Sequence, residues 1–331
     1  MLILNRSELR SVASMNDAIG LMKQAFQELS AGKAISPLRT PIEVGEHVGV
    51  SLFMPAFVPG SAALGMKLVS VFPQNPAIGL PTIHAVVCLV SADTGEPLAV
   101  IEGGYLTALR TGAVSGAATD LLARPESSTL VVIGSGAQGL TQAVAVCAVR
   151  PIDRLIVVGR DQERLDRFKN ALSEVELPTF KGTVESSTDA AAVVPLADII
   201  CTATTSKTPV FDDRDLKPGV HINAVGAFTP AMQEIPSATI ARSRVIVDLF
   251  DHAYAEAGDL ITPVSEGLVT PDHYRDELGM LVAGTIKGRT DNGQITFFKS
   301  VGNAVQDVVV AKLAFERASA LGIGQVVDLY A

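Results

Sequence analysis

A glycine-rich hexapeptide directly after an apolar run constrains the fold of this chain more than any other feature. Residues 128–134 (STLVVIG) have the composition of a buried strand, and Gly134-Ser135-Gly136-Ala137-Gln138-Gly139 then opens a predicted helix that ends near residue 149. In a G-x-G-x-x-G turn, the first glycine permits a tight turn, the second lets a pyrophosphate approach, and the third lets the helix contact the strand. We therefore predict a dinucleotide-binding βαβ unit, with a purely structural turn as the alternative.

The segments after this motif alternate between strands and helices. Apolar runs follow at 153–160, 197–204, 219–226 and 243–250, and a charged amphipathic helix is predicted over 161–172. Strands that are apolar along their whole length and are separated by helices are typical of a parallel, doubly wound sheet. We therefore expect an α/β fold in which residues 116–299 form a Rossmann-type dinucleotide-binding domain.

The flanking segments have a different pattern and predict a second domain. The stretch from 1 to about 35 is helical in period, with Ser14 as a candidate cap. Between Pro41 and Leu98, short β-branched runs are separated by Gly, Pro and Asn, which is typical of an antiparallel or mixed sheet. Helices are predicted over 107–122 and 300–321. Residues 1–115 together with 300–331 are expected to form an α+β domain.

Charge and composition argue against several classes of partner. The chain has 35 acidic and 26 basic residues, a formal net charge of −9 and no Trp, which disfavours nucleic acid and anionic membranes. No run reaches the roughly 18 apolar residues of a membrane span, and no signal peptide is recognised, so we expect a cytoplasmic protein. Cys88, Cys147 and Cys201 lack disulfide or zinc spacing and are expected to be buried thiols. No metal site is predicted.

The end of the second strand bears on the choice of nicotinamide cofactor. An NAD site usually places Asp or Glu there for the ribose 2′-hydroxyl, whereas this chain has Gly159-Arg160, followed by Asp161. Because arginine can pair with a 2′-phosphate, NADP(H) is favoured over NAD(H), and a solvated turn residue is the alternative for Arg160. Further candidate contacts of the dinucleotide are Thr111, Thr202, Ala203, Thr204, Val225, Gly226, Ser300 and Gly302.

Motifs along nearly the whole chain resemble those of the ornithine cyclodeaminase/mu-crystallin family. The matching segments are Met54-Pro55, Gly65-Met66-Lys67, Gly79-Leu80-Pro81-Thr82, 94–98 (TGEPL), 106–111 (LTALRT), 133–139, 221–226 (HINAVG) and 298–302 (FKSVG). The resemblance implies an enzyme that handles a 2-amino or 2-imino acid with a nicotinamide cofactor. It also implies a homodimer built through the first domain, which would hold the substrate.

The resemblance further implies roles for three cations of the first domain. Arg39 and Arg110 match the family arginines that hold the substrate carboxylate, and Lys67 matches the lysine beside that carboxylate and the reacting nitrogen. A buried carboxylate requires such compensating cations. We expect Lys67, directly or through water, to relay a proton, and the nicotinamide to lie near 224–226 and 300–302. Surface salt bridges are the alternative for each cation.

Departures from the family pattern narrow the reaction. Ornithine cyclodeaminases carry a glutamate where this chain has Leu52, and an aspartate in the turn that here is 226–230 (GAFTP). Losing both groups disfavours cyclodeamination, and the missing aspartate also weakens the case for an alanine dehydrogenase. Reduction of a preformed imine is therefore ranked first, with 1-pyrroline-2-carboxylate, its six-membered homologue or a related ketimine giving the L-amino acid.

Several alternatives stay open. For the reaction, they are an L-amino-acid dehydrogenase, an acyclic imino-acid reductase of the alanine or iminosuccinate type, an ornithine cyclodeaminase and a non-catalytic nucleotide-dependent binding protein. His84, which the resemblance places on a strand bordering the pocket, is either a contact to an acidic substrate side chain or a hydrogen-bonded core histidine. His221 is interpreted as structural. The acidic stretch formed by Asp248, Asp251, Glu256 and Asp259 is expected to be solvated or at a hinge.

Overall fold

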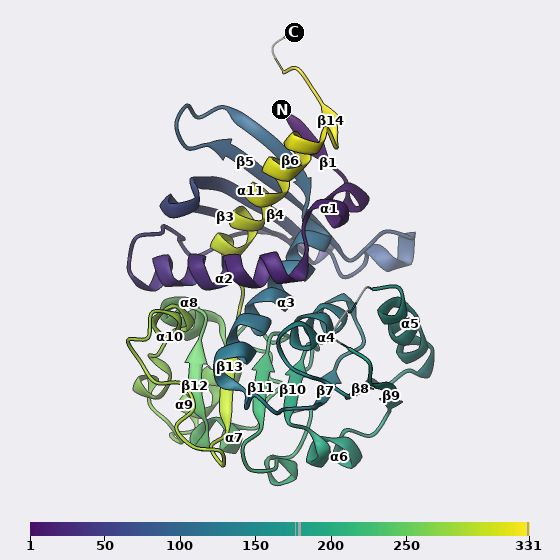
Figure 1. Ribbon diagram of the computed structural model, residues 1–331, viewed down its shortest axis with the longest axis vertical. Helices are drawn as coiled ribbons and strands as arrows, with labels where there is room; N and C mark the ends of the chain where they lie inside the picture. The colour runs from purple at the N-terminus through teal and green to yellow at the C-terminus, as the bar shows by residue number, and fades with distance from the viewer. Residues whose placement is uncertain (176, 178–179, 330) are drawn as a thin grey trace. The chain divides into compact units, whose positions relative to one another are not determined.

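The chain divides into two compact units. The computed structural model describes residues 1–175, 177, 180–329 and 331 (Figure 1). Unit 1 comprises Met1–Arg110 and Asn303–Ala331, and unit 2 comprises Thr111–Gly302. The first boundary between the units falls inside helix α3 (Gly103–Leu122), whereas the sequence pattern predicts a boundary after residue 115.

Unit 2 is built on a seven-stranded parallel sheet. Its strands are β7 (Thr129–Ile133), β8 (Arg154–Val158), β9 (Thr183–Ser187), β10 (Ile199–Thr202), β11 (His221–Ala224), β12 (Arg244–Val247) and β13 (Thr296–Lys299). They lie in the order β12-β13-β11-β10-β7-β8-β9, so the direction of winding reverses between β7 and β10. This confirms the predicted doubly wound α/β fold. β9 and β13 have no counterpart among the predicted strands.

Helices connect these strands and the apolar strand residues form the core. The helices are α4 (Ala137–Val149), α5 (Gln162–Ser173), α6 (Ala190–Val193), α7 (Ser237–Arg242), α8 (Phe250–Glu256), α9 (Gly258–Ser265) and α10 (Leu278–Val282). Val131, Ile200 and Ile222 of three neighbouring strands are completely buried, as expected for a parallel sheet that is covered by other elements. No helix in the described part of the chain has the length and apolarity that crossing a membrane requires.

Unit 1 contains a second, mixed sheet of seven strands. The strands are β1 (Leu2–Leu4), β2 (Thr40–Val44), β3 (Gly49–Val58), β4 (Ala63–Val71), β5 (Ile83–Ser91), β6 (Pro97–Glu102) and β14 (Gln325–Val326). β2 to β6 pair antiparallel with their neighbours in chain order, and β1 pairs parallel with β6. The predicted antiparallel or mixed sheet is therefore confirmed.

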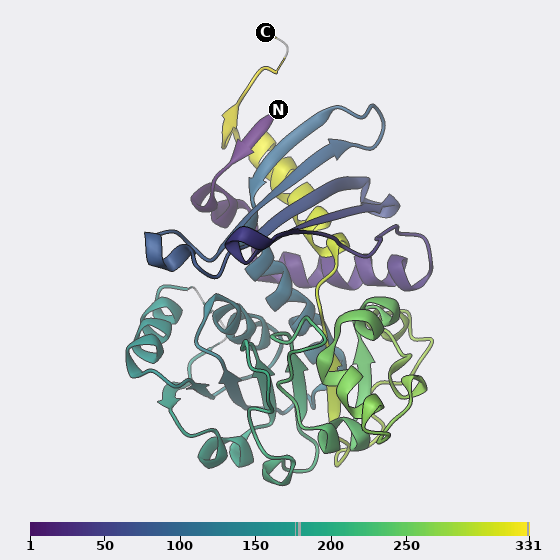
Figure 2. The ribbon, with the colours of Figure 1, turned by 180° about the vertical axis from the view of Figure 1, so that it is seen from behind.

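Three helices belong to this sheet. They are α1 (Arg6–Val12), α2 (Met15–Ser30) and α11 (Ala304–Leu321), and α11 packs against β3, β4 and β5 and also against α2 (Figures 1 and 2). The predicted cap is confirmed, since the Ser14 side chain accepts a hydrogen bond from the N–H of Asp17. The expectation of helix from residue 1 is wrong, because 2–4 pair with β6 instead. The last helix lies in unit 1.

Candidate active site

The predicted dinucleotide-binding residues of unit 2 gather at one edge of its sheet. They follow or end five neighbouring strands: 134–139 after β7, 159–160 after β8, 202–204 at β10, 225–226 after β11 and 300–302 after β13. The carboxyl ends of parallel strands share an edge, and ligands of such sheets bind there, where the winding reverses. Backbone hydrogen bonds continue along this edge, from the N–H of Ala203 to the carbonyl of Ile133 at 2.9 Å, for example.

The glycines of the motif meet the demands of a phosphate-binding turn. Gly134 has a φ of +118°, and a Cβ there would lie 2.5 Å from the carbonyl oxygen of Ala203. A Cβ at Gly139 would overlap the carbonyl oxygen of Gly134, so glycine allows α4 to begin this close to β7. Gly136 begins α4 without any side-chain cap, and a Cβ there would meet no atom within 4 Å. The free N–H groups and open space fit a pyrophosphate.

The residues after β8 have distinct environments. Arg160 is exposed and makes no side-chain hydrogen bond or ion pair with any described residue. Asp161, in contrast, caps α5, because its Oδ1 accepts a hydrogen bond from the N–H of Arg164 at 3.2 Å. The carboxylate that follows Arg160 is thus used within the fold. Another predicted dinucleotide contact, Thr111, lies in α3 and not at a strand end. It is buried, and its carbonyl accepts a hydrogen bond from Gln142 of α4 at 3.1 Å.

A buried glutamate that the sequence did not single out joins two of the strand-end loops. Glu234 accepts hydrogen bonds from the hydroxyl of Thr202, the last residue of β10, at 3.0 Å and from the N–H of Thr204, just after β10, at 2.6 Å. It also accepts from the N–H groups of Gly226 at 2.8 Å and Ala227 at 3.1 Å, which follow β11. Burial raises the pKa of Glu234. Four donors at one carboxylate fix the relative position of both loops.

Asp248 and Asp259 are buried, so the expectation of a solvated acidic stretch is wrong for both. Asp248 accepts from the hydroxyl of Ser300 at 2.7 Å and the N–H of Gly302 at 3.1 Å, 54 residues along the chain. Asp259 accepts from the N–H of Glu234 at 2.6 Å and pairs with Lys299 at 2.7 Å. Both carboxylates hold loops of the predicted dinucleotide site in place. The sequence around them does not reveal this, because their hydrogen-bond partners are far away along the chain.

In unit 1, the structure brings Lys67 and Arg110 together around a carboxylate that the sequence did not predict. The Nζ of Lys67 lies 2.8 Å from Oδ2 of Asp307, and Nε of Arg110 lies 3.1 Å from its Oδ1. Arg110 also donates to the side-chain oxygen of Gln306. The exposed fractions are 2% for Lys67, 5% for Arg110 and 0% for Asp307. The surface salt bridge considered for these two cations is therefore wrong.

Strand register explains why Lys67 lies in the interior. On β4 it pairs with Met54 of β3 and Val87 of β5, both of which are buried. Paired residues of antiparallel strands share a face, so the lysine belongs to an apolar row. Arg39 directly precedes β2, and the next residue, Thr40, pairs with Phe53 of β3, the neighbour of Met54. The positive charge of Arg39 acts on Lys67. Lys67 and Arg110 thus share one carboxylate, and Arg39 of the same unit acts on Lys67 through its charge.

A glycine lets the last helix approach this row. Gly65 precedes Lys67 by two residues and lies on the same face of β4. A Cβ there would lie 2.4 Å from the carbonyl oxygen of Cys88 on β5 and 3.3 Å from Cγ1 of Val308 in α11. Glycine therefore allows β5 and α11 to approach β4 this closely, two residues from Lys67.

The surroundings lower the pKa of Lys67 to about 7. Burial has the largest effect, because it disfavours the charged ammonium, and the charge of Arg110 acts in the same direction. Asp307 opposes both. An amine that exchanges its proton near neutral pH suits general acid–base chemistry.

His84 lies apart from this cluster. It pairs with Ser70 of β4, three residues from Lys67, and successive side chains alternate between faces, so His84 lies on the opposite face. Its side chain is exposed. The interpretation as a core histidine is therefore wrong, and the structure does not bring His84 together with Lys67 and Arg110.

The three cysteines are not members of either group of residues described above. All three are free thiols; Cys147 and Cys201 are buried, as predicted, whereas Cys88 is half-buried. Burial raises the pKa of both Cys147 and Cys201 to about 12, so neither is a nucleophile near neutral pH.

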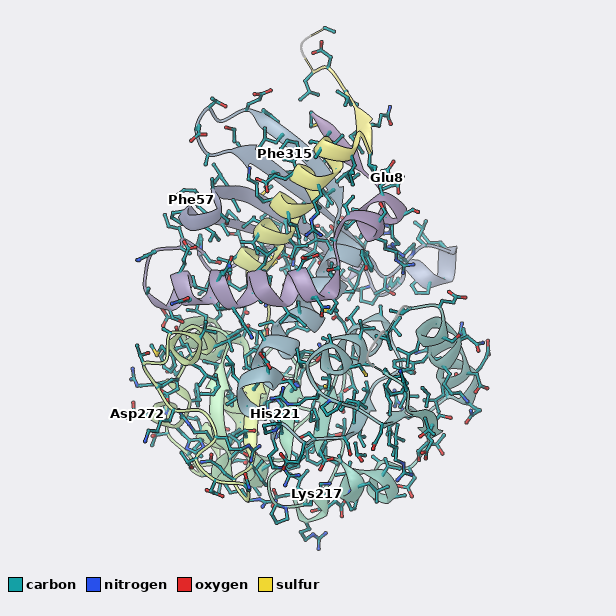
Figure 3. All side chains as sticks on the ribbon, in the orientation of Figure 1. Glu8, Phe57, Lys217, His221, Asp272 and Phe315 are labelled. Atoms are coloured by element: carbon teal, nitrogen blue, oxygen red, sulfur yellow. The ribbon has the colours of Figure 1, made fainter. Side chains whose placement is uncertain are left out.

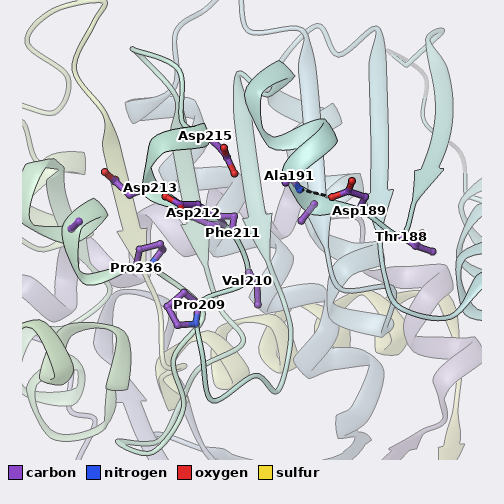
Figure 4. A pocket seen from close by; sticks show the side chains of 12 residues that line it. Thr188, Asp189, Ala191, Pro209, Val210, Phe211, Asp212, Asp213, Asp215 and Pro236 are labelled. Atoms are coloured by element: carbon purple, nitrogen blue, oxygen red, sulfur yellow. Dashed lines mark hydrogen bonds between the residues drawn. The ribbon is translucent and has the colours of Figure 1, made fainter.

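Unit 2 also has a hollow of about 720 Å³, and Figure 4 shows the side chains that line it. Its lining includes the carboxylates of Asp189, Asp212, Asp213 and Asp215. Asp189 accepts from the N–H of Ala191 at 3.0 Å at the start of α6, and Asp213 pairs with Arg242 at 2.9 Å. A lining that is negative and shares no residue with the predicted contacts is unsuited to dinucleotide phosphates.

Comparisons with known proteins give results that agree with this geometry. The model of the ornithine cyclodeaminase/mu-crystallin family matches residues 1–322. A delta(1)-pyrroline-2-carboxylate reductase of Bacillus cereus is 41% identical over 99% of this chain and 100% of its own length.

Two solved structures superpose over almost the whole chain. The delta(1)-pyrroline-2-carboxylate reductase of Thermococcus litoralis, in complex with NADH and L-proline, has a TM-score of 0.94 and 41% identity, and the match covers 99% of this chain and 100% of that one. An archaeal alanine dehydrogenase dimer with bound NAD has a TM-score of 0.91 and 32% identity, with 100% and 99% covered.

Proposed function

The chain belongs to the ornithine cyclodeaminase/mu-crystallin family, and from this membership we propose that it is an NAD(P)H-dependent reductase of a cyclic 2-imino acid. The proposed substrate is 1-pyrroline-2-carboxylate, and the product is L-proline. The observation that carries the proposal is the buried group of Lys67 and Arg110, a site with cations for a carboxylate and an amine that titrates near pH 7. The Bacillus and Thermococcus relatives, named as reductases of this imine, support the choice of ring.

The arginines hold the substrate carboxylate. Nε of Arg110 is bound by Asp307 and another nitrogen by Gln306, which fixes the plane of the guanidinium. A fixed guanidinium binds a carboxylate with less loss of side-chain freedom than a mobile one. Arg39 supplies the second positive charge.

Lys67 supplies the proton that the imine nitrogen needs. An N–H bond of its ammonium breaks as an N–H bond forms on the imine, which makes the imine carbon more electrophilic. The bound nicotinamide supplies the hydride that this carbon accepts. Leu52 and the turn 226–230 offer no carboxylate for a second amine, which favours reduction over cyclodeamination.

We further propose a preference for NADP(H) over NAD(H). Arg160 is exposed and unpaired among the described residues, so it is available for a 2′-phosphate. Asp161 caps α5, so its carboxylate has a role other than binding a ribose hydroxyl.

We also propose that the protein acts as a homodimer through unit 1. Phe53, Leu68 and Val86 pair in one row on the sheet face opposite Lys67, and all three are half-buried or exposed in the single chain. An apolar sheet face of this kind favours burial against another surface. The related archaeal alanine dehydrogenase is a dimer.

The test is NADPH oxidation with 1-pyrroline-2-carboxylate, followed by absorbance. We expect rapid oxidation by the wild-type chain, with L-proline as product. The Lys67→Met variant should lose about 10²-fold or more in kcat, because proton donation is removed, while its Kd for NADPH is unchanged. Full turnover in Lys67→Met would refute its role. If the wild-type chain oxidises NADPH only with ammonia and pyruvate, the amino-acid dehydrogenase alternative replaces the cyclic imine.

A further inference from the structure

We propose that Asp307 is a positioning residue that keeps Lys67 protonated and fixes its direction for proton transfer to the imine nitrogen. This inference rests on the function proposed above, because proton transfer to the imine nitrogen is a step of that function. One carboxylate contacts both cations, with Oδ2 at 2.8 Å from Lys67 and Oδ1 at 3.1 Å from Arg110. Through this bridge, the proton donor and a carboxylate-binding arginine have a fixed separation.

The charges around Lys67 show why a counter-ion is needed. Among the described residues, the charged groups with the largest effects on it are Asp307 of α11, Arg110 of α3 and Arg39 before β2. The paired residues of the adjacent strands, Met54 and Val87, are not ionisable. A buried amine beside two guanidinium groups would lose its proton well below neutral pH if Asp307 carried no charge.

The first turn of α11 fixes the position of this carboxylate. The side chain of Asn303 accepts a hydrogen bond from the N–H of Val305 at 3.0 Å. It also accepts from the N–H of Gln306, whose side chain accepts from the N–H of Asn303 at 3.1 Å, and these two bonds form a capping box. The same Gln306 oxygen also receives the guanidinium of Arg110. The positive end of the helix dipole favours a negative charge at Asp307.

Asp307 itself neither gives nor accepts a proton during the reaction. The ammonium of Lys67 becomes a neutral amine when the imine nitrogen gains its proton, and the electron pair of the hydride ends in the new C–H bond. Solvent then returns a proton to Lys67 before the next turnover. Asp307 stays ionised throughout and acts by stabilising the ammonium form between turnovers.

The experiment compares the pH dependence of kcat/KM for the imine in the wild type and in Asp307→Asn. Asparagine keeps the shape of the side chain and removes its charge. The alkaline limb, where Lys67 loses its proton, should move to lower pH by at least about one unit, while the Kd for NADPH is unchanged. If Asp307 is merely structural, thermal stability falls and the limb keeps its position, which would overturn the proposal.

A matched control removes another carboxylate that pairs with α11. Asp17 of α2 lies 2.7 Å from Arg317 near the other end of this helix, in a partly exposed pair. Asp17→Asn therefore loses an ion pair to α11 without altering the charge at Lys67. Its pH profile should match the wild type.

A second measurement does not depend on turnover. The 13Cε signal of Lys67 in lysine-labelled protein, assigned with Lys67→Arg, reports its protonation directly, so failure of the proposed function leaves this test intact. The midpoint should fall by at least about one pH unit in Asp307→Asn. An unchanged midpoint, or a wild-type Lys67 that is already neutral at about pH 6, would contradict the proposal.

A conservative variant covers the case in which Asp307→Asn does not fold. Asp307→Glu keeps the charge but displaces it by one methylene group. We expect its alkaline limb to stay near that of the wild type while kcat falls about tenfold, since the direction of the ammonium changes. A limb that moves as far as in a neutral variant would contradict the proposal.

Discussion

Arg160 offers a test of cofactor choice at a single side chain. Its charge stands at the end of β8 without a described partner. Arg160→Ala should raise the KM for NADPH about 10- to 100-fold, because a charge-assisted hydrogen bond to the 2′-phosphate is lost. The KM for NADH should change less than about twofold, because NADH has no 2′-phosphate for Arg160 to bind. Arg167→Ala, at another exposed arginine of the same segment, is the control, and an equal rise with both cofactors would refute the phosphate role.

The sequence predicted the cations of the site better than their counter-ion. Lys67 and Arg110 lie in motifs that resemble those of the family, whereas Asp307 lies 197 residues beyond Arg110 in a helix predicted only as amphipathic. The sequence signal for this counter-ion is an aspartate on the apolar side of the predicted helix. That signal alone does not indicate an ion pair, because an aspartate in the first turn of a helix also stabilises the helix by itself.

A chain of buried polar groups links β11, β13 and α3. His221 Nδ1 lies 2.9 Å from the hydroxyl of Thr296, and its Nε2 lies 3.2 Å from Oδ1 of Asn223. Asn223 donates to the hydroxyl of Thr119 at 2.9 Å. The predicted structural role of His221 is confirmed, and the residue lies within unit 2 (Figure 3). Burial lowers its pKa to about 3, with the charge of Arg289 acting in the same direction.

This histidine should make the stability of unit 2 depend on pH. Between about pH 6.5 and the folded pKa of about 3, the unfolded chain binds a proton that the folded chain does not. The free energy of unfolding should therefore fall with falling pH, by about 2 kcal/mol between pH 6.5 and 5 from this group. Urea unfolding at several pH values should show that the free energy of unfolding falls less with falling pH in His221→Gln than in the wild type, by about 2 kcal/mol between pH 6.5 and 5. His47→Gln, at an exposed histidine, should show the same pH dependence as the wild type. An equal fall in His221→Gln and wild type would contradict the prediction.

Elements with a clear apolar period were predicted, and those that depend on distant pairing were not. β9 (Thr183–Ser187) is a polar edge strand with no fully buried residue, so it lacks the pattern of its neighbours. β13 is only four residues long and inserts between β11 and β12, an order that chain position does not reveal. β1 has three residues and is stabilised by β6 and β14. Such segments become strands through partners rather than through their own sequence.

The proposed dimer can be tested on the whole molecule. Val86 is 37% exposed in the single chain, on the sheet face away from α11. Val86→Glu would place a charge in the proposed interface, so sedimentation should show a shift from dimer to monomer. Leu268→Glu, at an exposed apolar residue of unit 2, is the control. A Val86→Glu chain that stays dimeric, or a wild type that is monomeric, would contradict the proposal.

The discontinuity of unit 1 has a consequence for synthesis on the ribosome. Its sheet is complete by residue 102 except for β14, but the helix that covers Lys67 and supplies Asp307 begins at residue 304, after all of unit 2. Until then, the nascent chain carries an uncovered apolar sheet face and a lysine without its counter-ion. Unit 2 is contiguous and has everything its own fold needs before α11 emerges. The environment of Lys67 is therefore completed only after all of unit 2 has been synthesised, and chains that stall before α11 should depend on chaperones and be degraded.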